Sequence, residues 1–107
     1  MPDRPEIVCI CGSTRFVDEM SAANRDPTLA GVIVVAPGVF PRADDHEADE
    51  LITSDQQAAL GALHLRKIDL ADRVLVVNLG GYIGESTSRE IAYAQAAGKP
   101  ISFTDPV

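Results

Sequence analysis

Apolar residues along the chain gather in four short runs, at residues 6–11, 32–36, 74–77 and, more weakly, 101–103. Within each run the apolarity is continuous rather than alternating, and β-branched residues are frequent. Strands that are buried on both faces of a sheet show this pattern. The pattern therefore predicts four strands of one parallel sheet.

Amphipathic stretches separate these runs. The first predicted helix covers residues 14–24, where Phe16 and Met20 lie four positions apart on one face. Pro27 is expected to restart or kink this helix, because proline has no backbone N–H to donate. Gly31 is expected to cap its C-terminus before the second strand.

The second helix is predicted over residues 54–70, and Ser54 and Gln57 have the spacing of a capping box at its start. The third helix is predicted over residues 86–97 and is expected to end at Gly98. Strands and helices therefore alternate along the chain.

This alternation predicts an α/β fold of the flavodoxin-like kind, with three layers (α/β/α) and a parallel sheet of about four strands in the order 2-1-3-4. A chain of 107 residues has room for one such domain, residues 1–107. In such a sheet the ligand crevice opens at the carboxyl ends of the strands at the switch point, here the first and the third. The segments that follow those two strands are therefore the places where we expect chemistry.

The chain is acidic, with nine basic and sixteen acidic side chains and a formal charge of −7. We therefore expect no binding to nucleic acid or to anionic membranes. The apolar runs are far shorter than the ~20 residues of a membrane span. The first residues are too polar for a signal peptide, so we expect a cytoplasmic protein. The irregular segment 37–53 carries five of the acids and His46, and its length is typical of a functional or a disordered connection.

Gly12, Ser13, Thr14 and Arg15 follow the first strand. Glycine permits a close turn, hydroxyl groups and backbone amides at a helix start attract anions, and arginine can bind a phosphate or carboxylate with two hydrogen bonds. We interpret this loop as a candidate substrate-binding site. The alternative is an ordinary N-cap at Ser13 beside a solvated arginine.

The segment after the third strand crowds glycines, hydroxyl groups and carboxylates together. Its candidate site residues are Asn78, Tyr82, Gly84, Glu85, Ser86, Thr87 and Glu90. In the first turn of a helix, Glu90 would feel the positive end of the helix dipole, which lowers the pKa of a carboxyl group and keeps it ionised, as a nucleophile requires. The alternative is structural, because Thr87 and Glu90 also have capping-box spacing.

His64 lies on the same helical stripe as Leu60 and Ile68 and is expected to face inward, either as a core residue or as a proton donor in the crevice. Cys9 and Cys11 have C-x-C spacing on a strand, so their thiols share one face. A disulfide does not suit this spacing, and a zinc site would need two further ligands, for which no residue is suitably spaced. We interpret both cysteines as small buried apolar residues and expect neither a metal nor another cofactor.

Three blocks of the chain resemble one known family. Residues 7–13 (IVCICGS), residues 71–77 (ADRVLVV) and residues 90–94 (EIAYA), followed by Gly98 and Lys99, resemble the nucleoside 2-deoxyribosyltransferase superfamily, including its deoxynucleoside 5′-monophosphate N-hydrolase branch. The blocks occur in the family's order over almost the whole chain. The resemblance implies one nucleoside 2-deoxyribosyltransferase-like domain that acts on a small nucleoside or nucleotide.

The resemblance also implies a mechanism. Glu90 stands at the position of the family's nucleophile, which attacks C1′, displaces the base and passes the sugar to another base or to water. Residues 12–15 correspond to a region that contacts the nucleoside or its phosphate. The chain departs from the pattern at His64, where many members carry an aspartate, and at Gly84, where the transferase branch carries one, with Glu85 beside it. His64 or Glu85 is then the candidate proton donor or base-orienting group.

Three functions remain open on the sequence. The first is an enzyme that cleaves or transfers an N-glycosidic bond, the second is a nucleotide-binding module of the same fold without chemistry, and the third is an oligomerising scaffold. Fold alone does not separate them. In all three we expect a homo-oligomer, because so small a domain gains stability by association and members of the family commonly complete their pockets across a subunit boundary.

Overall fold

The structure is a computed structural model that describes residues 4–13, 16–36 and 53–106. The predictions for Thr14, Arg15, His46 and the segment 37–52 lie outside the described residues. The described helices and strands are, in chain order, β1 (Ile7–Gly12), α1 (Val17–Leu29), β2 (Ile33–Val35), α2 (Ser54–Leu70), β3 (Arg73–Val77), the short 3-10 helix η2 (Leu79–Gly81), α3 (Glu85–Ala96) and β4 (Ile101–Phe103).

The four strands form one parallel sheet in the order β2-β1-β3-β4, which confirms the predicted order. The central strands β1 and β3 are the most buried, in agreement with their continuous apolar runs. Gly12, the last residue of β1, is paired with Val77, the last residue of β3. The segments after these two strands therefore start side by side at one edge of the sheet.

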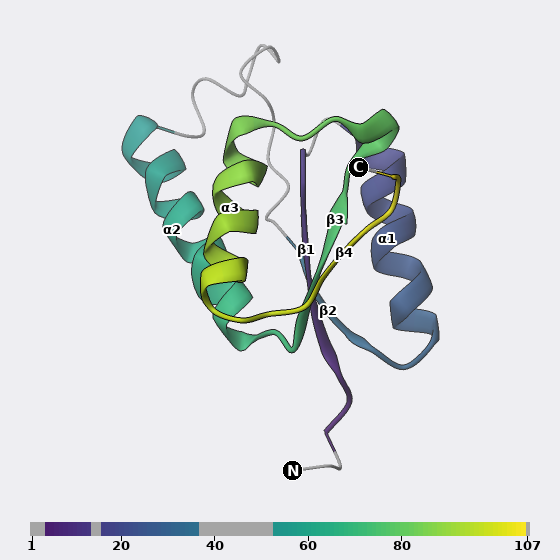
Figure 1. The fold of residues 1–107 in the computed structure, drawn as a ribbon. Coiled ribbons are helices and arrows are strands. Elements are labelled where there is room, and N and C mark those ends of the chain that lie inside the picture. Colours follow the sequence, from purple (N-terminus) through teal and green to yellow (C-terminus); the bar gives the residue numbers. More distant parts are fainter. Residues whose placement is uncertain (1–3, 14–15, 37–52, 107) are drawn as a thin grey trace.

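Helix α1 covers one face of the sheet, and α2 and α3 cover the other, which gives the predicted three layers (Figure 1). Alternate residues of β1 supply the two cores. Cys9 and Cys11 pack with Ile68 on the side of α2 and α3, whereas Ile10 packs with Ala23 of α1. Among the described helices none combines the length and the apolarity needed to cross a membrane.

Glycine ends α1 as predicted, and it ends α3 in the same way. Gly31 and Gly98 follow these helices with φ of 89° and 75°. After α1, the N–H of Val32 donates to the carbonyl of Pro27 at 2.9 Å, and the N–H of Lys99 makes the equivalent bond after α3. These are Schellman motifs, in which a residue with positive φ lets the chain turn back onto the last carbonyls of the helix.

Two details of the predicted helices are wrong. Helix α1 begins at Val17, later than predicted, and continues through Pro27, which costs one hydrogen bond near the end of the helix. The capping box of α2 lies one residue before the predicted pair. The Thr53 hydroxyl accepts from the N–H of Gln56 at 3.1 Å, and the Gln56 side chain accepts from the N–H of Thr53 at 2.8 Å.

Candidate active site

An open groove of about 1350 Å³ lies between α2 and α3 and reaches the carboxyl end of β1. Nine of the predicted site residues line it: Gly12, Ser13, His64, Tyr82, Gly84, Glu85, Ser86, Thr87 and Glu90. The groove thus opens where a doubly wound sheet takes its ligands. A smaller hollow of about 420 Å³ beside α1 is lined by none of the predicted site residues.

Glu90 lies in the second turn of α3, because the helix begins at Glu85 after an N-cap at Gly84. Its carboxylate faces α2, where Oε1 is 3.8 Å from Nε2 of His64, and 16% of the Glu90 side chain remains exposed. The capping-box interpretation of Thr87 and Glu90 is therefore wrong. The carboxylate instead forms part of the groove wall, beside an imidazole.

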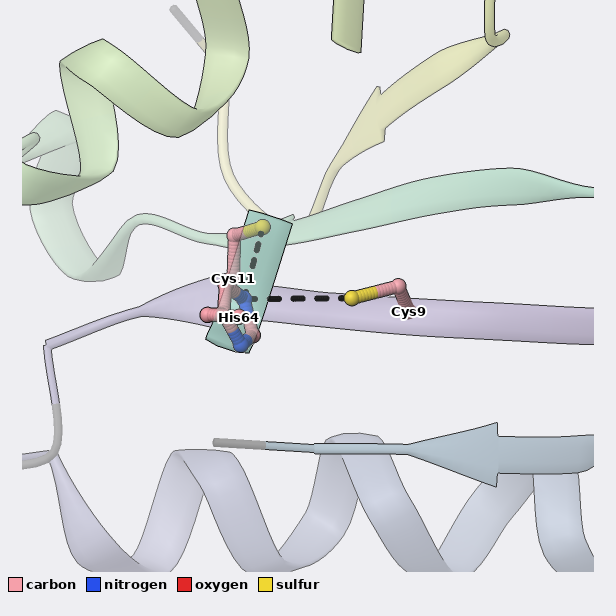
Figure 2. Close-up of side chains that lie close together, drawn as sticks. All are labelled: Cys9, Cys11 and His64. Atoms are coloured by element: carbon pink, nitrogen blue, oxygen red, sulfur yellow. Dashed lines mark hydrogen bonds between the residues drawn. The ribbon is translucent and has the colours of Figure 1, made fainter. Parts of the chain in front are cut away.

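His64 projects from α2 onto β1, where it meets both cysteines (Figure 2). Its Nε2 is 3.4 Å from Sγ of Cys11 and 3.8 Å from Sγ of Cys9. The imidazole is 5% exposed, and its Nδ1 has no hydrogen-bond partner among the described residues. His64 therefore faces inward, as its stripe predicted. Its neighbours there are two thiols and a carboxylate.

Burial raises the pKa of Glu90, and the charge of His64 offsets part of that rise. The expected lowering of this pKa is therefore wrong. Burial, in contrast, opposes protonation of His64, but the hydrogen bond with Cys9 and the charge of Glu90 outweigh burial and raise the pKa of His64. Hydrogen bonding to Cys11 lowers the pKa of Cys9 to about 5, and the same bond, together with burial, raises the pKa of Cys11.

Gly12 brings the end of β1 against β3. Its φ is +151°, and a Cβ atom there would lie 2.8 Å from the carbonyl oxygen and 3.1 Å from Cβ of Val77. A side chain at this position would push the two strands apart beneath the groove. Nearby, the rings of Phe16 and Tyr82 pack edge to face with centroids 5.8 Å apart, which joins the segment after β3 to the start of α1.

Asn78 does not line the groove, so its interpretation as a substrate-binding residue is wrong. The side chain is fully buried. Its Oδ1 accepts from the N–H of Asp105 at 2.9 Å and from the Thr104 hydroxyl at 3.3 Å, and its Nδ2 donates to the carbonyl of Asp105 at 3.0 Å. Asn78 therefore joins the end of β3 to the segment after β4.

Glu85 and Ser86 lie at the rim of the groove. The carboxylate of Glu85 is 3.7 Å from the guanidinium of Arg89, and 91% of the Glu85 side chain is exposed. Arg89 also donates to the hydroxyl of Ser86 at 3.4 Å. Glu85 is thus a solvated acid, unlike the partly buried Glu90.

Helix α2 supplies a wall of the groove in which only His64 was predicted. Gln57 and Lys67 line this wall, and Tyr93 of α3 faces it. The Tyr93 hydroxyl accepts from Arg66 and donates to Asp69, both at 2.7 Å, and so holds α2 and α3 together. The amphipathic pattern predicted helix α2 and placed His64 on its inward stripe, but it contained no signal that Gln57 and Lys67 face the groove rather than solvent.

Comparison with known proteins finds a solved structure with the same fold. No protein-family model matches the chain, and no curated protein matches it. Among solved structures, the chain is similar to that of a 2-deoxyribosyltransferase from the psychrotolerant bacterium Bacillus psychrosaccharolyticus. The TM-score is 0.66 at 16% sequence identity, over 94% of this chain and 76% of that chain. This protein and that 2-deoxyribosyltransferase therefore share one fold.

Proposed function

We propose that this protein cleaves or transfers the N-glycosidic bond of a nucleoside or nucleoside monophosphate, with Glu90 as the nucleophile. The observation that carries the proposal is the place of the Glu90 carboxylate, partly buried beside an imidazole in the wall of a groove at the carboxyl edge of the sheet. A titratable pair with shifted pKa values in a cleft is typical of catalytic sites. The fold shared with a 2-deoxyribosyltransferase supports the same class of reaction.

In the first step an oxygen of Glu90 attacks C1′. A C–O bond forms, the C1′–N bond breaks, and the base leaves with the electron pair and takes up one proton. In the second step water, or a ring nitrogen of another base, attacks C1′, releases the Glu90 carboxylate and loses one proton. Two inversions give retention at C1′. Protonated His64, 3.8 Å from the carboxylate, stabilises the ionised form that attacks.

His64 and Glu85 both line the groove and are the two candidate donors of the proton that the base takes up. General acid catalysis matters more as the leaving group becomes more basic. A series of substrates whose bases differ in basicity therefore separates the two. The rates of His64→Gln and Glu85→Gln are compared over this series. The donor is the residue whose substitution lowers the rate more strongly as the leaving base becomes more basic.

The decisive experiment is an assay for free base on a panel of ribonucleosides, deoxyribonucleosides and their 5′-monophosphates, with and without an acceptor base. Glu90→Gln keeps the shape of the side chain and is expected to lower turnover by about 10³-fold or more. Glu19→Gln, on α1 across the sheet, is the matched control and is expected to retain turnover. Acid-quenched protein is expected to carry a sugar on the peptide that contains Glu90. Turnover that persists in Glu90→Gln would contradict the role of this residue.

A nucleotide-binding module without chemistry is the second candidate, and one observation favours it. Burial raises the pKa of Glu90 and so disfavours the ionised form that a nucleophile needs. In that case a nucleotide raises the melting temperature of the protein and no base is released. Binding would then tolerate Glu90→Gln but not Arg15→Ala.

A further inference from the structure

Three metal-ligating side chains meet beneath the groove, which His64 lines and the two cysteines do not. Cys9 and Cys11 project from β1, His64 comes from α2, and all three are buried (Figure 2). One ligand atom from each lies within 4.8 Å of the others. We propose that these three side chains bind one Zn²⁺ ion, with its fourth position on the side of the Glu90 carboxylate.

The distances match the edges of a zinc tetrahedron. Zn–S bonds of about 2.3 Å and Zn–N bonds of about 2.0–2.1 Å place a sulfur and a nitrogen ligand about 3.6 Å apart around a tetrahedral ion. The two distances from Nε2 of His64 to the sulfurs are 3.4 Å and 3.8 Å. Both sulfur–nitrogen distances are therefore close to those that a tetrahedral ion requires, and the three ligand atoms lie within 4.8 Å of one another.

The fourth position has a protein ligand within reach. Oε1 of Glu90 is 3.8 Å from the same Nε2, and Glu90 and His64 both line the groove. An ion or a water molecule can therefore reach this position from the groove. Carboxylate oxygen is an accepted zinc ligand beside sulfur and nitrogen.

The chemistry of the ligands selects the ion. Thiolate sulfur and imidazole nitrogen favour zinc, whereas Mg²⁺ and Ca²⁺ prefer oxygen ligands. A disulfide is the other chemistry open to two neighbouring cysteines. Cys9 and Cys11 are two positions apart on a strand, so their Cα atoms are about 6.6 Å apart, near the upper limit for a disulfide. Both cysteines are free thiols in the structure.

Direct titration tests the zinc site without any nucleoside, so its outcome is read separately from that of the glycosyl-transfer assay. Zinc on Nε2 of His64 takes the place of the proton that the proposed function assigns to His64. In the zinc-bound protein the positive charge beside Glu90 is therefore that of the ion, and Glu85 remains the candidate proton donor. The reduced, chelator-treated chain is titrated with Zn²⁺ against a chromophoric chelator. We expect one equivalent per chain. Cys11→Ala is expected to weaken zinc binding by more than roughly 100-fold. Loss of a residue that only hydrogen-bonds to a metal ligand costs roughly 10–100-fold, and loss of a ligand itself should cost more. His46→Asn removes the other histidine of the chain and is the matched control, which should bind as the unaltered protein does.

Cobalt substitution covers the case in which a cysteine variant fails to fold. Co²⁺ bound to the unaltered protein should show thiolate-to-cobalt charge transfer and the intense visible bands of a tetrahedral ion. Each of three results would overturn the site: no stoichiometric binding, no thiolate charge transfer, or full zinc binding by the Cys9→Ala, Cys11→Ala double variant. An intact mass two hydrogens lighter in the absence of reductant would show a disulfide and would overturn it as well.

Discussion

At the scale of single residues, Glu90 shows how two electrostatic effects compete. The helix dipole contributes about 0.3–1 kcal/mol and acts mainly on the first turn. Burial of a carboxyl group can shift its pKa by as much as 3–5 units, and one unit is about 1.4 kcal/mol. Glu90 lies in the second turn and is largely buried, so burial is the larger effect and raises its pKa.

Gly12 allows a prediction at the same scale. A side chain there meets the backbone of Val77, and the φ of +151° is strained for any residue except glycine. Gly12→Ala is therefore expected to lower the free energy of unfolding by about 1–3 kcal/mol. Urea denaturation followed by circular dichroism measures the change.

Gly61 supplies the control for this substitution. It lies within α2, its φ is not positive, and a Cβ atom there would meet nothing within 4 Å. Gly61→Ala is expected to raise the free energy of unfolding by about 0.5–1 kcal/mol, because alanine is the better helix former. If both variants shift stability equally, close packing is not the reason for glycine at position 12.

At the scale of elements, Asp72 joins the start of β1 to the turn between α2 and β3. Its carboxylate accepts from the N–H of Ile7 at 2.9 Å and from two nitrogens of Arg4 at 3.0 Å and 3.2 Å. These bonds favour the ionised form and lower the pKa of Asp72 to about 2, with the Arg4 contact as the largest cause. Asp72 thus has a structural role, because it ties the start of β1 to the turn before β3.

This contact predicts a pH dependence of stability. A carboxyl group with a lowered pKa stabilises the folded state above the unfolded pKa of about 3.9, and that contribution disappears as the pH falls toward 2. The unaltered protein is therefore expected to be more stable than Asp72→Asn at pH 6, and the difference should shrink between pH 4 and pH 2. Urea midpoints at several pH values measure it. Asp26→Asn is the control for the loss of one surface carboxylate. A difference in stability between the unaltered protein and Asp72→Asn that stays constant from pH 6 to pH 2 would contradict the prediction.

At the scale of the whole molecule, α2 leaves apolar side chains uncovered. Leu63 and Leu70 are seven positions apart, hence on one face of the helix, and are 50% and 68% exposed. We predict that a second copy of the chain covers this face, so light scattering after gel filtration should give the mass of a dimer. Leu63→Glu is expected to shift the mass to that of a monomer with the fold retained.

Leu29→Glu is the matched control, because Leu29 is 79% exposed on α1 at the other face of the sheet. It should leave the dimer intact. A monomer in the unaltered protein, or equal effects of both substitutions, would show that the face of α2 is not the interface.

The sequence alone determined the strands, the sheet order and the glycine caps that end α1 and α3. Continuous apolar runs separated by helices leave few topologies open, because crossovers are right-handed and short. Gly31 could be identified as a cap because its effect depends on neighbouring residues only. The other helix ends were less well determined. Helix α1 covers Val17–Leu29 rather than residues 14–24, and the cap of α2 is Thr53, where two adjacent hydroxyl residues compete for the position.

Only the tertiary structure decided the contacts of the site. His64 is more than fifty positions from Cys9 and Cys11 along the chain, and its contact with them depends on how α2 packs over β1. Asn78 was predicted as a substrate-binding residue, but the segment after β4 brings Asp105 against its side chain. Helical periodicity predicts which side chains face inward, but it carries no information about which strand lies beneath them. That choice is made by the packing of the whole core, in which each contact depends on many others.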